Sequence, residues 1–111
     1  MIRGGAVALG VSDVGRAVRF YVETLGMKLV REAPDGSAIV DAGEGFQIAL
    51  SAGGAGAPSA SVQLYPKVPI DEAIAIYENR GVSFTIERTE GRVVARFQDP
   101  DANSLALVQA A

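Results

Sequence analysis

Residues 6–26 read AVALGVSDVGRAVRFYVETLG, and this stretch decides the fold. Residues 6–11 are apolar and compatible with a short β-strand, and Ser12-Asp13 supplies good helix N-cap residues directly after it. Gly26 is placed to end a helix as a C′ glycine does. Between them, apolar residues recur at spacings of three and four, the pattern of one buried helix face: Val14, Ala17, Val18, Tyr21 and Leu25. The stretch therefore predicts a strand followed by a helix.

The rest of the first half predicts three more strands, at residues 27–32, 37–41 and 46–51. Pro34-Asp35-Gly36 is typical of a tight turn between the first two of them. The first half is thus expected to run strand, helix, strand, strand, strand.

The second half repeats this order. A strand is expected at 61–65, and strands at 82–88, 92–97 and 104–109 complete the set. A second amphipathic helix closed by Gly81 lies between them, marked by Ile70, Ala73, Ile74 and Tyr77. The two helix-ending glycines, at 26 and 81, are 81 − 26 = 55 residues apart. The sequence therefore indicates an internal duplication.

We expect a single domain over residues 1–111, made of a module at 1–51, a linker at 52–60 and a module at 61–111. The linker is rich in Gly and Ala and has no Lys or Thr, so it is typical of a flexible connection rather than a phosphate-binding loop. Two arrangements stay open: the modules pair within one chain, or they are exchanged between two chains.

Composition excludes several classes of site. The 111 residues contain no Cys and no His, which excludes disulfides, zinc–thiolate centres, His-ligated metals and Ser-His-Asp catalysis. A net charge of −3 and scattered Lys and Arg give no footprint for nucleic acid. The chain has no signal-peptide profile, and no apolar run approaches the ~20 residues that span a bilayer. We expect a cytoplasmic protein with neither a nucleic-acid nor a membrane partner.

Two strings resemble a known family. Residues 7–13 (VALGVSD), followed by Ala17-Val18-Arg19-Phe20-Tyr21 and Leu25-Gly26-Met27, resemble the first module of the vicinal oxygen chelate superfamily. Residues 97–105 (FQDPDANSL) are similar to its "DPDGN" turn, with Ala102 in the glycine place. That superfamily includes glyoxalase I, extradiol dioxygenases and bleomycin-resistance proteins. The resemblance implies an α+β fold in which two βαβββ modules form an incomplete barrel around a cavity, and it implies a homodimer.

In metal-using members of the family, each module offers ligands from its first and last strands. The matching positions here are Ala6, Ala49, Ser61 and Ala106. Methyl groups cannot bind a divalent ion, and one neutral hydroxyl is a poor ligand. We therefore expect no metal and no cofactor, and a non-enzymatic role is favoured over glyoxalase or dioxygenase chemistry.

Candidate ligand-binding residues follow from strand alternation, which places polar side chains on the sheet face opposite the helices. Alternation assigns Gln47, Gln63 and Tyr65 to this face, and Arg96 is added as a further polar strand residue. A mostly apolar site with a few convergent polar groups is the usual make-up of a small-molecule site. Two other features are interpreted as structural: Asp99-Pro100-Asp101 as a turn and Phe20-Tyr21 as core packing.

The leading hypothesis is a metal-free protein that binds a small organic molecule, as in the bleomycin- and mitomycin-resistance branch, with antibiotic sequestration as one form of it. A first alternative is a metal-independent isomerase or cyclase whose acid–base groups are carboxylates or Tyr. A metal-dependent lyase or dioxygenase is the second alternative, if the metal-site alignment is wrong. The third is a structural module whose cavity is filled by side chains.

Overall fold

The computed structural model describes residues 6–53 and 62–110, and the chain divides into two compact units. The first unit comprises Met1–Ser59 together with the turn Pro100–Asn103. The second comprises Ala60–Asp99 and Ser104–Ala111. Each unit contains one four-stranded sheet and its helical segment.

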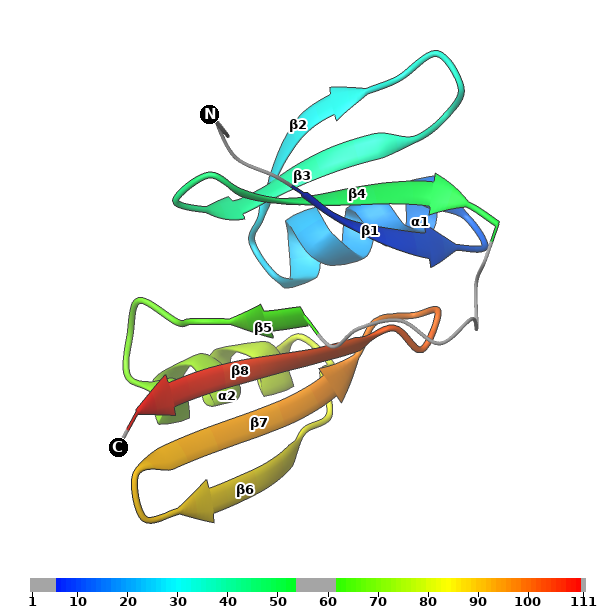
Figure 1. Ribbon diagram of the computed structural model, residues 1–111. Coiled ribbons are helices and arrows are strands. Elements are labelled where there is room, and N and C mark those ends of the chain that lie inside the picture. Colours follow the sequence, from blue (N-terminus) through cyan, green and yellow to red (C-terminus); the bar gives the residue numbers. More distant parts are fainter. Residues whose placement is uncertain (1–5, 54–61, 111) are drawn as a thin grey trace. The chain divides into compact units, whose positions relative to one another are not determined.

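The first unit has the element order that the first half of the sequence predicts: strand, helix, strand, strand, strand. Its sheet has the strand order β1-β4-β3-β2, in which β1 runs parallel to β4 and the other pairs are antiparallel (Figure 1). The elements are β1 (Ala6–Val11), α1 (Val14–Arg19), η1 (Phe20–Thr24), β2 (Lys28–Glu32), β3 (Ala38–Gly43) and β4 (Phe46–Ala52).

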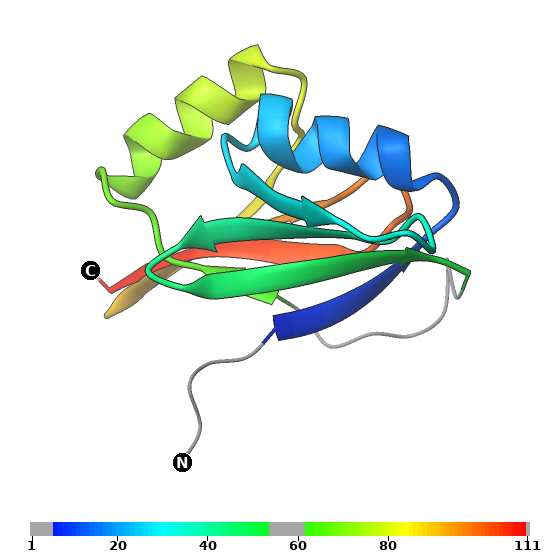
Figure 2. The same ribbon diagram turned by 90° about the horizontal axis from the view of Figure 1, so that it is seen from above.

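One face of this sheet is covered by α1, as Figure 2 shows. Residues on that face are buried: Leu9, Val11, Val40, Ile48 and Leu50. Tyr21 is fully buried and meets Phe20 edge-to-face, with ring centroids 5.3 Å apart. The prediction that Tyr21 belongs to the core is confirmed.

The helix that the sequence predicts over one continuous stretch changes type at Phe20. Residues Phe20–Thr24 form a π-helical turn, closed by Leu25 N–H donating to the Phe20 carbonyl at 3.0 Å. Apolar spacings of three and four do not distinguish an α-helix from one with a single π turn, because the buried face changes by only one residue. Gly26, at φ 81°, ends the segment as expected.

The second unit repeats the arrangement, with the strand order β5-β8-β7-β6 and β5 parallel to β8. Its elements are β5 (Val62–Leu64), α2 (Ile70–Asn79), β6 (Thr85–Thr89), β7 (Arg92–Gln98) and β8 (Ser104–Ala110). The core of this unit is formed by one face of α2 and the sheet face beneath it: Val62, Ile70, Ala73, Ile74, Phe97, Leu105 and Leu107.

Strand β6 begins later than the sequence predicts, at Thr85 rather than Val82. Val82 is buried directly after the helix, and Phe84 packs on Phe97 with ring centroids 5.2 Å apart. These two side chains hold the segment in the core before the strand pairing starts.

The predicted class, α+β with two βαβββ modules, is confirmed. Strand β4 continues through Ala52, and residues 54–60 of the expected linker lie outside the described residues, as does Ser61. None of the helices within 6–53 and 62–110 has the length and apolar character needed to cross a bilayer.

Candidate functional site

The sheet of the first unit has a face without a helix, and small side chains dominate its β1–β4 half. The strand register pairs Ala6 with Gln47 and Ala8 with Ala49. Because paired residues share a face, all four lie opposite the buried Ile48. Ala6 and Ala8 are exposed, and Gln47 and Ala49 are half-buried. This half of the face therefore presents methyl groups and one amide.

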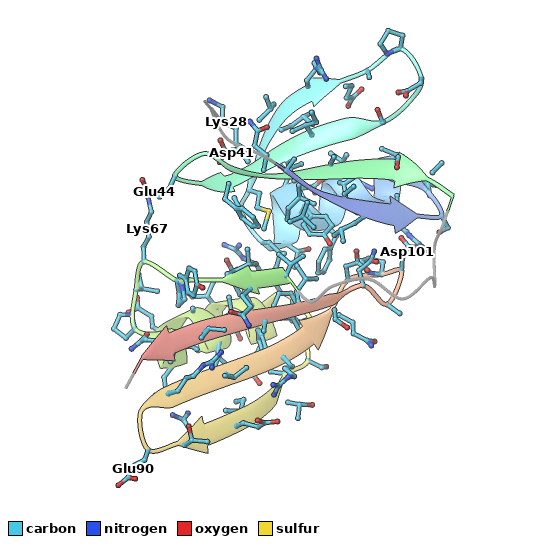
Figure 3. The ribbon with its side chains drawn as sticks, viewed as in Figure 1. Lys28, Asp41, Glu44, Lys67, Glu90 and Asp101 are labelled. Carbon is cyan, nitrogen blue, oxygen red and sulfur yellow. The ribbon has the colours of Figure 1, made fainter. Side chains whose placement is uncertain are left out.

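Charged residues lie on the other half of the same face. Lys28 of β2 pairs with Asp41 of β3, and Figure 3 shows the two on neighbouring strands. A register shift between Leu29 and Arg31 then makes Arg31 the partner of Ile39. A bulge changes which face the following residues occupy, so Lys28 and Arg31 share a face although they are three residues apart. Asp41 Oδ1 accepts the Gly43 N–H at 2.6 Å.

In the second unit, two predicted site residues lie in one row across the helix-free face. Ala106 of β8 pairs with Gln63 of β5 on one side and with Arg96 of β7 on the other. Thr85 of β6 continues the row beyond Arg96. Ala106 is 3% exposed, whereas Gln63, Arg96 and Thr85 are exposed. The row thus has a short buried residue between two long polar ones.

An ion pair crosses the outer part of this face. Arg96 Nη1 lies 2.6 Å from Glu87 Oε1, and both side chains are more than half exposed. Arg92 lies four residues before Arg96 on β7, so strand alternation places the two side chains on the same face. Within the described residues, the Arg92 side chain has no hydrogen bond or ion pair.

Sequence reasoning found Arg96 but not Arg92 or Glu87. Alternation along β7 relates Arg92 to Arg96, so that signal was present in the sequence. Glu87 joins them only through the antiparallel register of β6 and β7, which the sequence does not specify.

The remaining predicted residues are more separate. Tyr65 directly follows β5 and is 74% exposed. Gln47 belongs to the sheet of the first unit, whereas Gln63, Tyr65 and Arg96 belong to the second unit. The structure therefore brings Gln63 and Arg96 into one row and places Tyr65 next to the strand that carries Gln63.

The positions that carry metal ligands in the resembled family do not suit a metal. Ala6 pairs with Gln47, and Ala49 pairs with Ala8. Ala6 and Ala49 are therefore diagonal neighbours on the two strands rather than direct partners. Ala6, Ala49 and Ala106 present only methyl groups, and the fourth position, Ser61, lies outside the described residues. No three His, Cys, Asp or Glu side chains gather in residues 6–53 and 62–110 as a group able to hold an ion. The donor set does not fit a divalent metal.

Asp101, in the turn between β7 and β8, is engaged structurally (Figure 3). Its Oδ1 accepts the Ser12 hydroxyl at 2.6 Å, the Ser12 N–H at 3.0 Å and Arg16 Nη2 at 3.0 Å. Chiefly the Ser12 hydroxyl bond, with Arg16 assisting, holds the pKa of Asp101 below its usual value. Asn103 donates to the Gly10 carbonyl at 3.1 Å. This turn therefore fastens the end of β1 and the start of α1, as a structural element.

Comparisons with known proteins agree with this architecture. TnmS3, an antibiotic binding protein from a Streptomyces species, is 28% identical, with a TM-score of 0.85 over 100% of this chain and 98% of that one. A superfamily member from Sphaerobacter thermophilus is 30% identical, with a TM-score of 0.81 over 97% of both chains. A glyoxalase/bleomycin resistance protein from a Streptomyces species is 29% identical, with a TM-score of 0.79 over 96% of this chain and 99% of that one.

A search of curated protein sequences finds no match. Residues 4–107 match the model of a family whose fold the two units share. The chain therefore belongs to the Glyoxalase/Bleomycin resistance protein/Dioxygenase superfamily.

Proposed function

We propose that this chain binds a small organic molecule on the helix-free face of the sheet in its second unit and holds it without a metal. The observation that carries the proposal is the row Arg96–Ala106–Gln63, a short side chain between two long hydrogen-bonding ones. The alanines of the β1–β4 half give the other unit a face with little side-chain bulk. Apolar surface with a few polar groups is the composition of small-molecule sites.

The carboxylates on these faces favour binding over catalysis. Glu87 is paired with Arg96, and Asp41 accepts the N–H of Gly43. A carboxylate that already accepts a short bond is a weaker general base than a free one, because proton uptake has to break that bond. Sequestration needs no acid–base group, and the polar side chains of these faces can donate and accept hydrogen bonds.

The similarity to TnmS3 supports an antibiotic as the ligand, since that protein is an antibiotic binding protein. Antibiotic sequestration is therefore the form of the proposal that we test first.

The test is a titration of isotope-labelled protein with mitomycin C, bleomycin and an anthraquinone, followed by amide NMR. Saturable shifts at the β5, β7 and β8 residues of this face are expected. Thr85→Trp fills an exposed position on this face and should weaken binding, whereas Ala75→Trp on the exposed side of α2 is the matched control. Shifts confined to other surfaces, or none with any of the three compounds, would contradict the proposal.

The metal-free part has its own test. Chelator-treated protein is heated with Zn²⁺, Ni²⁺, Mn²⁺, Fe²⁺ or Mg²⁺, and the melting temperature is recorded. An ion bound only by the native state at 100 times its Kd adds about 2.7 kcal/mol of stability, which shifts Tm by several degrees. We expect no shift with any ion, and a saturable shift would contradict this part.

We also propose that the chain is a homodimer, as its family resemblance implies. The edge strand β2 is exposed at every residue and includes Leu29 and Val30, which are 37% and 49% exposed. An exposed edge with apolar side chains is suited to pairing with another chain. Light scattering should give twice the mass of one chain, and Val30→Lys should lower it; a monomer at all concentrations would contradict the proposal.

A further inference from the structure

The helix-free face of the second unit differs in charge from the rest of that unit. On the face lie Arg92, Arg96 and Glu87, a net charge of +1. Elsewhere the described residues of the unit carry three basic and five acidic side chains, a net charge of −2: Lys67, Arg80, Arg88, Asp71, Glu72, Glu78, Glu90 and Asp99. This face therefore carries a net positive charge, whereas the rest of the unit is acidic.

The geometry of the row suits an anionic group. Neighbouring strands lie ~4.8 Å apart, so the backbones of Arg96 and Gln63 are about 10 Å apart with Ala106 between them. Both side chains are exposed and carry N–H donors, and Ala106 is too short to compete with them. An anion above this residue can therefore accept from both sides.

The Glu87 carboxylate holds the Arg96 guanidinium in place, and it also competes with an incoming anion for that guanidinium. The ion pair occupies Nη1 of the guanidinium, which has five N–H donors in all. Donors on Nε and Nη2 are left for a second acceptor, and a guanidinium already held loses less side-chain freedom on binding. Arg92 adds a second positive charge on the same face.

We propose that the small molecule carries a carboxylate, and that Arg96 and Gln63 bind this group, with Glu87 limiting the affinity. This inference rests on the proposed function and adds the chemical class of the ligand. The carboxylate accepts from the Arg96 guanidinium and from the Gln63 amide, which flank the short side chain of Ala106.

The experiment compares two probes of the same shape, naphthoate and naphthalenemethanol, by NMR titration of the intact protein. We expect naphthoate to bind about tenfold more tightly, because a charge-assisted hydrogen bond adds roughly 1.4 kcal/mol at an exposed site. Its largest shifts should fall at Gln63, Arg96 and Ala106.

Two arginines of this unit form a matched pair of variants. Arg96 and Arg88 each pair with a carboxylate at 2.6 Å, and their side chains are 53% and 54% exposed. Arg88 faces the opposite side of the sheet and pairs with Asp71 of α2. Arg96→Gln should bring the affinity ratio of the two probes close to one, whereas Arg88→Gln removes the same charge and should leave the ratio unchanged.

Glu87→Gln should tighten naphthoate several-fold and leave naphthalenemethanol unchanged, because it removes the competing carboxylate. Amide spectra verify that each variant is folded. Equal affinity for both probes, or equal losses in Arg96→Gln and Arg88→Gln, would overturn this inference while small-molecule binding itself stands. If neither probe and none of the three antibiotics binds, the proposed function fails together with it.

Discussion

The two units start their helices in different ways, although they share one fold. In the first, Asp13 caps α1 itself, since its side chain accepts the Arg16 N–H at 3.0 Å. In the second, the N-cap residue is Pro69, which has no side-chain acceptor. Its place is taken by Gln109 of β8, whose Oε1 accepts the Ile70 N–H at 2.6 Å. A helix start can thus be fixed by the adjacent residue or by a strand far along the chain.

The last segment of the chain serves both helix starts. Asp101 binds Ser12 and Arg16 around the beginning of α1, and Gln109, eight residues later, binds the beginning of α2. Among the described residues, the first helix therefore has a local and a remote side-chain acceptor, and the second has only the remote one. We therefore expect the two units to lose different amounts of stability when these acceptor side chains are removed.

The largest effect is expected for Asp101→Ala. One oxygen of the carboxylate accepts three bonds, and the Asp101 side chain is only 4% exposed. The substitution leaves the two Ser12 donors and the Arg16 guanidinium without this acceptor. We expect a loss of about 3 kcal/mol in the free energy of unfolding, measured by urea denaturation. Amide exchange should speed up first in β1 and α1. A loss equal to that of an ordinary surface substitution would show that Asp13 alone holds this helix start.

The charge of Asp101 gives a pH dependence whose sign can be stated. Its pKa is lowered in the folded protein, mainly by the Ser12 hydroxyl bond, so folding favours the ionised form. The resulting stability is fully present above the unfolded pKa near 3.8 and is lost as pH falls through the lower folded pKa.

Asp101→Asn keeps the shape and removes the charge, so it isolates this contribution. The stability difference between the natural chain and this variant should be largest at about pH 7 and should shrink at about pH 3 and below. The pKa of Asp35 is also lowered, by its bonds to Ser37, so Asp35→Asn should show a pH dependence of the same sign and serves as a positive control. A difference that stays constant with pH would contradict the assignment to Asp101.

These contacts mark the limit of what the sequence could predict. Asp13 could be predicted as a cap because a capping side chain binds an N–H within the next three residues. Gly26 could be predicted as a helix end because the positive φ that ends a helix is its own. Gln109 and Asp101 act across 39 and 89 residues, so no local sequence pattern indicates their partners. The same is true of the site: alternation indicated Gln63, and Arg96 was a further polar strand residue, but the pairing of both with Ala106 and the ion pair with Glu87 depend on register.

Gln109→Leu tests the dependence of α2 on its remote acceptor. The substitution leaves the part-buried Ile70 N–H without an acceptor in a helix that lacks a capping side chain, and should cost about 2 kcal/mol. Asp13→Ala should cost less, about 1 kcal/mol, because Asp101 still holds the start of α1. Urea denaturation measures both losses.

A second substitution sharpens this test. Pro69 has φ −53° and ψ 138°, an extended conformation that Ser also adopts, so Pro69→Ser supplies a local cap. Adding it to Gln109→Leu should restore part of the lost stability, whereas in the natural chain it should change little. If Asp13→Ala costs more than Gln109→Leu, the comparison between the two helix starts is wrong.

The smallest expected effect concerns the turns before β4 and β8, where a non-glycine residue has positive φ: Glu44 at 54° and Ala102 at 65°. This conformation costs an L-residue roughly 1–2 kcal/mol, while glycine in its place adds about 0.4–1 kcal/mol of unfolded-state entropy. Ala102→Gly should therefore stabilise the protein slightly, by about 0.5 kcal/mol. Ala102 is the cleaner of the two sites because Glu44 takes part in another contact that its replacement would remove. If Ala102→Gly instead destabilises the chain and weakens the Asp101 contacts, a stiff turn is needed to hold Asp101 on α1, and the strained residue is part of that support.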